Sequence, residues 1–283
     1  MSNDFEQDDK SESIRPSRPS PVRPGEPSPR RPRPRDDFDD RPPSSGSSGL
    51  KIVLIILCVV GLFGLCLVGL CGGGIYYAVS RTRQAAYRMQ ETNNFKQIAL
   101  ALHNYNDKYG SFPPVQMKTK DGKPGLSWRV AILPFLEQES LYRQFKLDEA
   151  WDSPANKRLA AVMPKVYAPA EGGAAPEKTH VRVFAGQLAV FNFTQSRRIF
   201  DVTDGTANTF LLVESTDPVT WTEPTELSDN PNGPLPSLGM PNHDYFIAAM
   251  VDGSVRPIKK STSPQKIKAA ITAASNEPDR LDN

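Results

Sequence analysis

The strongest constraint on this chain is a long stretch without a charged side chain, from Ile52 to Ser80. About 20 apolar residues, at a rise of about 1.5 Å each, span a hydrocarbon core about 30 Å thick, and this stretch is longer. It is too long, and lies too far from Met1, for a cleaved secretory signal, whose apolar part has roughly 7–15 residues. We therefore expect residues 51–80 to form a transmembrane helix that contacts the lipid bilayer through residues 52–80.

This anchor separates a tail, residues 1–50, from a globular region, residues 81–283. All three cysteines, Cys58, Cys66 and Cys71, lie inside the apolar stretch. The globular region therefore has no disulfide, no thiolate metal site and no cysteine nucleophile. Its roughly 200 residues are enough for one domain with its own core.

The tail is rich in proline, arginine and serine and has almost no core-forming side chains. Such a segment cannot bury enough apolar surface to offset its ordering entropy, so we expect disorder. Prolines recur three residues apart at 16–19, 21–24 and 29–32, a spacing that polyproline-binding grooves recognise. A solvated spacer and adsorption to anionic lipid headgroups are the alternatives.

Lysine and arginine are slightly more numerous on the tail side of the anchor than on the domain side. The positive-inside rule then places the tail in the cytoplasm, and a single internal anchor commonly exports the large domain that follows it. We expect one pass through the inner membrane, with an extracytoplasmic domain. Gly69 and Gly73 are spaced for close helix–helix contact and predict self-association; the alternative is that glycine is simply common in membrane helices.

Apolar residues continue at helical spacing beyond the anchor, so we expect one helix from about Lys51 to Tyr109. Gly110 and Pro113 end it. Further helices are expected over 128–145, over 153–163 with Ser153 as N-cap, and over 264–274. The apolar face consists of Ala85, Met89, Phe95, Ile98, Ala99, Leu102, Tyr105 and Tyr109.

After Pro164 the pattern changes to a period of two with β-branched residues, which predicts strands. Asp252-Gly253 indicates a hairpin with a type I′ turn, and Pro257 places its second strand at a sheet edge. Residues 216–243 read as a loop. The expected class is α+β, a long helix packed on an antiparallel sheet. The strands are expected at 181–184, 189–193, 209–213, 245–251 and 254–258.

Several strings resemble a large pilin-like family of unknown function that is expanded in planctomycete-type bacteria. The matching strings are Thr92 to Asn106, Tyr109 to Pro114, Leu126 to Gln138, Leu147 to Asn156, Thr203 to Thr209 and Val251 to Arg256. The resemblance implies the plan of type IV pilins and type II secretion pseudopilins, a long helix followed by an exported sheet domain. Typical members begin with a short leader cut before a Phe-Thr-Leu-Ile-Glu-like start, which this chain lacks. We therefore interpret the anchor as permanent.

No catalytic constellation is complete. The histidines His103, His180 and His243 do not form a zinc motif. Asp201 and Asp204 are one residue too far apart for a phosphatase-type pair. The loop from Asp148 to Asn156 resembles an acidic tryptophan-containing loop of pseudopilins, a family in which a nearby loop holds calcium; the alternative is a capped turn with Trp151 buried.

These observations predict no catalytic, cofactor-binding or metal residues and no cofactor. We expect a non-enzymatic, membrane-anchored pilin-like protein that acts in cell-envelope assembly, secretion or surface scaffolding, with envelope or secretion-system proteins as partners and no nucleic acid. One alternative is an anchored ligand-binding or sensing module, in which Trp128, Trp151 and Trp221 line a cleft. An anchored enzyme is the other.

Overall fold

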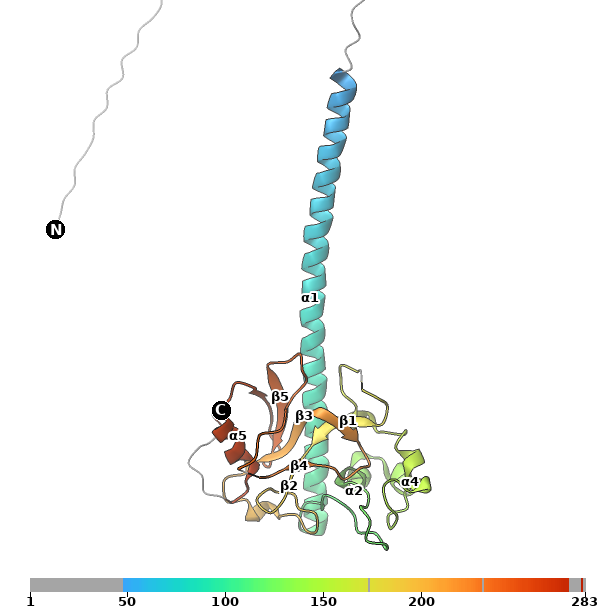
Figure 1. Cartoon of the computed structure of the whole chain (residues 1–283), viewed down its shortest axis with the longest axis vertical. Helices are drawn as coiled ribbons and strands as arrows, with labels where there is room; N and C mark the ends of the chain where they lie inside the picture. Colours follow the sequence, from blue (N-terminus) through green and yellow to red (C-terminus); the bar gives the residue numbers. More distant parts are fainter. Residues whose placement is uncertain (1–47, 173, 231, 275–280, 282–283) are drawn as a thin grey trace, which may run out of the picture. The chain divides into compact units, whose positions relative to one another are not determined.

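The computed structural model describes residues 48–172, 174–230, 232–274 and 281, and the side chains of 67–78 and 80 are not described (Figure 1). Most of the predicted disordered tail lies outside the described residues; its last part, from Ser48, belongs to a helix. By its contacts the chain separates into two units, Met1–Phe63 and Gly64–Asn283. The predicted α+β class, with an antiparallel sheet and an apolar helix, is confirmed.

Helix α1 covers Ser48–Tyr109, so the predicted helix is confirmed over its whole length. Its window Gly49–Cys66 is long and apolar enough to cross a membrane, and none of it is buried. Further along, Phe95, Ile98, Ala99 and Leu102 are buried. The predicted apolar face was too long, because Met89 is 68% exposed. The helix ends at Gly110, whose φ of 80° favours glycine and whose N–H donates to the Asn106 carbonyl at 2.7 Å.

Four strands form an antiparallel sheet in the order β1-β3-β5-β6. They are β1 (Lys178–Arg182), β3 (Phe210–Thr220), β5 (Tyr245–Met250) and β6 (Val255–Lys259). A parallel pair joins β2 (Phe184–Ala185) to β4 (Leu227–Ser228). β6 lies at an edge, as Pro257 predicted, since proline cannot donate to a neighbouring strand. β3 and β4 correct the predicted loop, because β3 continues to Thr220 by pairing with β1.

The β5–β6 hairpin forms at Asp252-Gly253, as predicted, but the turn type differs. Gly253 has a φ of 84°, and Asp252 has no positive φ, whereas a type I′ turn needs positive φ at both positions. The Gly253 N–H donates to the Met250 carbonyl at 2.9 Å, and the Met250 N–H donates to the Ser254 carbonyl at 2.8 Å. The extra loop residues make a wider turn with glycine at the left-handed position.

The predicted helix over 128–145 is wrong. The segment forms three short turns, α2 (Trp128–Ala131), η1 (Leu133–Leu136) and α3 (Glu139–Tyr142). Pro134 cannot donate within a helix, and Glu137 has a left-handed φ of 59°, which ends one turn and redirects the chain. Two other helices are shorter than predicted, α4 (Pro154–Leu159) and α5 (Pro264–Ile271). Ser153 caps α4 as predicted.

Two short helical turns were not predicted, η2 (Lys165–Tyr167) and η3 (Ile199–Asp201). The predicted strand over 189–193 is also wrong. Phe191 makes a single bridge to Ala185, and the Arg197 side chain donates to the carbonyls of Ala189 and Gln187 at 3.1 and 2.8 Å. A side chain therefore satisfies backbone groups that a neighbouring strand would otherwise pair.

The core has two parts, one on each face of the sheet. On β5, Ile247 and Ala249 belong to the part that includes Ile98 and Leu102 of α1. The alternate residues Phe246, Ala248 and Met250 belong to the part that includes Ile267 and Ile271 of α5. Strands covered on both faces read as continuous apolar runs, which explains the sequence of β5.

We predict that Leu102→Ala lowers the free energy of unfolding by about 2–5 kcal/mol, because the change leaves a cavity in a filled core. Leu102 is fully buried, whereas Leu100, two residues earlier on α1, is 61% exposed. Leu100→Ala is the matched control and should change stability by less than about 0.5 kcal/mol. Denaturant unfolding of both variants measures the difference; equal losses would contradict the assignment of the buried face.

Candidate functional site

Arg129 and Glu226 form an ion pair in the middle of the domain. Both side chains are 0% exposed, and Nη2 of Arg129 lies 2.7 Å from Oε1 of Glu226. Arg129 also donates from Nε and Nη2 to the Val181 carbonyl and from Nη1 to Ser127. A buried guanidinium is tolerated when its donors meet acceptors in this way.

The partners of Glu226 come from distant parts of the chain. Its Oε1 accepts from Nε1 of Trp128 at 2.9 Å, and its Oε2 accepts from the Val183 N–H at 2.9 Å. The Arg129 carbonyl in turn accepts from the Tyr167 hydroxyl at 3.0 Å. The Arg182 guanidinium lies 3.7 Å from Oε2 of the same carboxylate. These contacts link α2, β1 and the segment before β4. We interpret this network as structural: it stabilises the fold.

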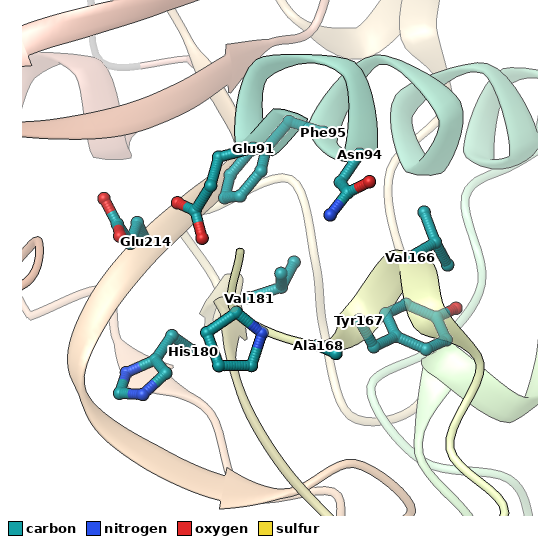
Figure 2. Close-up of a pocket in the computed structure, with 10 residues that line it drawn as sticks. Glu91, Asn94, Phe95, Val166, Tyr167, Ala168, His180, Val181 and Glu214 are labelled. Atoms are coloured by element: carbon teal, nitrogen blue, oxygen red, sulfur yellow. The ribbon is translucent and has the colours of Figure 1, made fainter. Parts of the chain in front are cut away.

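A second polar cluster, of which Glu214 is buried and the rest partly buried, lies between α1, β1, β3 and the segment around η2 (Figure 2). Its cavity of about 10 Å³ is bordered by Glu91, Asn94, His180 and Glu214, with Tyr167 at the far end. One water molecule needs about 10–15 Å³, so an organic ligand does not fit. The chemistry of this cavity is therefore limited to its own side chains, a water molecule or a proton.

Glu91 and Glu214 bring two carboxyl groups together at this cavity (Figure 2). Glu214 is 1% exposed, and its Oε2 accepts from the Ile247 N–H at 3.1 Å. Its Oε1 is buried and meets no donor in the described part of the chain. Burial first, and then the negative charge of Glu91, raise the pKa of Glu214 from 4.5 to about 8. Unlike Glu226, this carboxyl group makes no ion pair in the described part of the chain.

Neighbouring polar side chains have other partners. His180 Nδ1 lies 2.8 Å from the Ser215 carbonyl oxygen, and Lys260 donates to the Met240 carbonyl at 2.7 Å. His243 pairs with Glu171 at 2.8 Å and stacks on Tyr245. The Arg88 guanidinium lies over the same tyrosine ring, 5.0 Å from its centre. The contacts of Arg88 and His243 meet at the Tyr245 ring, close to the carboxyl pair.

The sequence singled out other residues, which the structure separates. His103 packs edge-on against Phe112 on α1, and His243 lies with Glu171. Asp201 pairs with Arg198 and caps η3, and Asp252 accepts from the Ser254 N–H. No two of these side chains share a site, and each has a packing or capping contact.

The acidic loop from Asp148 to Asn156 is held by hydrogen bonds of the Asn156 side chain. Asn156 is buried and exchanges hydrogen bonds with the N–H and carbonyl of Lys146, both at 2.9 Å. Asp148 pairs with Lys120. The described residues contain no group of three or more His, Cys, Asp or Glu side chains arranged to hold a metal ion. The geometry is that of the capped turn, except that Trp151 is only partly buried.

Two of the three tryptophans expected to line a cleft lie in the core, and the third, Trp151, is partly buried against it. Trp128 and Trp221 are fully buried in the core, where Trp221 stacks on Tyr167 and donates to the Ala160 carbonyl at 2.8 Å. Their role is packing. The sequence feature that supported a ligand-binding module is therefore part of the fold.

The carboxyl pair was not predicted. Its signal in the sequence is Glu214 directly after the apolar run Phe210 to Val213, because a strand buried on both faces has no solvent for a charge. Glu91 carries no comparable signal: it stands among polar residues on α1, and only the packing of α1 on β3 brings it to Glu214.

Comparison with known protein families gives one match, which covers part of this domain. A family model described as "Protein of unknown function (DUF1559)" matches residues 80–186, from the domain half of α1 to β2. No curated protein and no solved structure matches the chain. The match supports a family of unknown function and carries no activity with it.

We predict that Glu226→Gln costs about 3–5 kcal/mol of stability, because it leaves the buried Arg129 without its counter-charge. The control is Glu139→Gln, which removes an ion pair with Arg143 in which Glu139 is 50% exposed; that change should cost less than about 1 kcal/mol. Thermal and denaturant unfolding measure both. A cost for Glu226→Gln no larger than for the control would show that the network does not support the fold.

Proposed function

We propose that this chain is a single-pass membrane protein whose pilin-like domain acts without catalysis, by binding or scaffolding in cell-envelope assembly, secretion or surface organisation. The observation that carries the proposal is that α1 has an exposed apolar part and a part buried in the domain core. Its window Gly49–Cys66 is apolar and wholly unburied, and its later residues Ile98 and Leu102 lie in the domain core. One helix thus supplies both the anchor and the core.

The exposed window favours lipid as its surroundings. Ile55, Phe63 and Leu65 are 61%, 67% and 72% exposed. Burial of apolar surface is worth about 25 cal/mol per Å², and contiguous apolar surface of this size is rare on soluble monomers. A bilayer removes this surface from water without a partner protein. The predicted self-association face at Gly69 and Gly73 lies outside the residues whose side chains are described, and it stays part of the proposal.

The assignment of a scaffold rests on what the polar residues do. Asn156, Glu226 and Arg197 satisfy backbone or buried groups, and Asp201 and Asp252 cap turns. Residues committed to such contacts hold the fold and have little freedom to act on a substrate. We place the domain outside the cytoplasmic membrane and the tail in the cytoplasm, with an unprocessed anchor.

We predict that external protease on intact spheroplasts digests the domain, residues 81–283, and leaves the tail, residues 1–50, protected. Fractionation should place the protein in the membrane pellet, and mass spectrometry of the mature amino terminus should show an intact tail. Protease applied to lysed spheroplasts is the control, because it reaches both sides. Trimming of the tail alone would show that the topology is the opposite of the one proposed. Release of the protein from the membrane by carbonate at alkaline pH would show that the apolar segment is not a transmembrane anchor.

We predict that changing Asp152, Asp204, His243 or Asp252 to alanine alters folding or assembly and abolishes no turnover. Each variant is compared with wild type for melting temperature, membrane level and activity in a general hydrolase screen. Glu139→Gln, at an exposed position, is the control for nonspecific loss. A hydrolase activity that disappears in one variant while its melting temperature holds would overturn the scaffold assignment.

A further inference from the structure

Glu214 lies in the contact between α1 and the sheet, and one of its two carboxyl oxygens has no hydrogen-bond donor among the described residues. Its Oε1 is buried without a donor in the described part of the chain, while its Oε2 accepts from the Ile247 N–H. Across the cavity, Glu91 accepts from the Ala170 N–H at 3.1 Å through Oε1. The two carboxyl groups can hydrogen-bond each other only if one of them carries a proton, because ionised carboxylates only accept.

Among the described residues, the charged groups on the neighbouring elements make no ion pair with Glu91 or Glu214. From α1, Arg88 lies over the Tyr245 ring, and from β1, His180 contacts the Ser215 carbonyl oxygen. Beyond β6, Lys260 lowers the pKa of Glu214 by its charge but donates its hydrogen bond to the Met240 carbonyl. Glu171 forms its own pair with His243.

We propose that Glu91 and Glu214 share one proton, and that this proton is the ligand that fastens α1 to the sheet. With the proton, a hydrogen bond links α1 to β3. Without it, two carboxylates face each other in a cavity that holds one water molecule at most, and the contact between α1 and β3 loosens. The pair is a proton-binding site built into the attachment of the domain to its own helix.

The direction of the pH dependence follows from the raised pKa. In the unfolded chain Glu214 ionises near its ordinary pKa of 4.5, and in the folded protein its pKa is about 8. Between these values the folded state holds more protons than the unfolded state, so stability falls as pH rises. The stabilisation is complete below about pH 4.5 and is lost as pH passes through about 8.

The biological setting of this site rests on the proposed function, but its chemistry does not. If α1 is the anchor, the packing of the domain on its anchor helix responds to pH in the neutral to alkaline range. If fractionation finds the protein in the soluble fraction, the proposed membrane anchor is wrong, but the proposal of a shared proton still stands. Fractionation therefore tests the anchor and the titration tests the proton, and either proposal can be refuted without the other.

The test is a titration of full-length protein in detergent, by infrared spectroscopy of protonated carboxyl groups and by denaturant unfolding from about pH 5 to about pH 9. We expect a protonated-carboxyl band at neutral pH in wild type and in the control Glu139→Gln. The band should be absent in Glu214→Gln. In Glu91→Gln it should weaken at neutral pH, because burial still raises the pKa of Glu214 but the negative charge of Glu91 is gone. The unfolding equilibrium constant of wild type should rise by more than about tenfold over this range, relative to Glu214→Gln.

Glutamine at position 214 has an amide that can donate to Glu91, so it mimics the protonated pair and should keep the domain stable at high pH. If Glu214→Gln fails to fold, Glu91→Gln, on the partly exposed helix position, gives the same comparison. Hydrogen exchange along 88–102 should quicken above about pH 8 in wild type beyond the intrinsic effect of pH, and less in either variant. A missing band at neutral pH, or an unchanged pH dependence in both variants, would overturn the proposal.

Discussion

The structure depends on the packing of one face of α1 against the sheet. Phe95, Ile98 and Leu102 fill one side of β5, and this contact decides which residues of the strand face the helix. The opposite side of the sheet would then be bare, so the chain needs α5 to cover Phe246 and Met250. Because both faces are buried, Glu214 on the inner strand β3 is out of reach of solvent. The side chain of Glu226, just before β4, is also buried, and the two carboxyl groups are stabilised in different ways.

The buried carboxylate of Glu226 is stabilised by the opposite charge of Arg129, whereas burial of Glu214 favours its uncharged, protonated form. Glu226 meets Arg129, Trp128 and the Val183 N–H, which together replace the water it loses. Glu214 has one backbone donor and faces another carboxyl group, so burial raises its pKa to about 8. The first arrangement is a buried ion pair between opposite charges. The second changes with pH, and it lies at the contact that organises the domain.

Local signals in the sequence predicted what local interactions determine. The length of α1, the hairpin at Asp252-Gly253, the edge position of Pro257 and the Ser153 cap follow from periodicity, turn residues and missing donors. The helix over 128–145 was mispredicted although Pro134 is a local signal against it, and the strand over 189–193 was mispredicted because the Arg197 side chain satisfies its backbone. The carboxyl pair was out of reach for a different reason: Glu91 and Glu214 meet only once α1 is packed on β3.

The extent of the domain follows from where these partners lie. The segment similar to the family of unknown function, residues 80–186, contains Arg129 and Glu91. Their partners Glu226 and Glu214 lie beyond it, as do β3, β5 and β6, which form most of the sheet. Residues 80–186 alone would leave a guanidinium buried without its counter-charge and the α1 face without β5. The physical unit that folds is therefore larger than the matched segment and extends at least to α5, which closes the second face of the sheet.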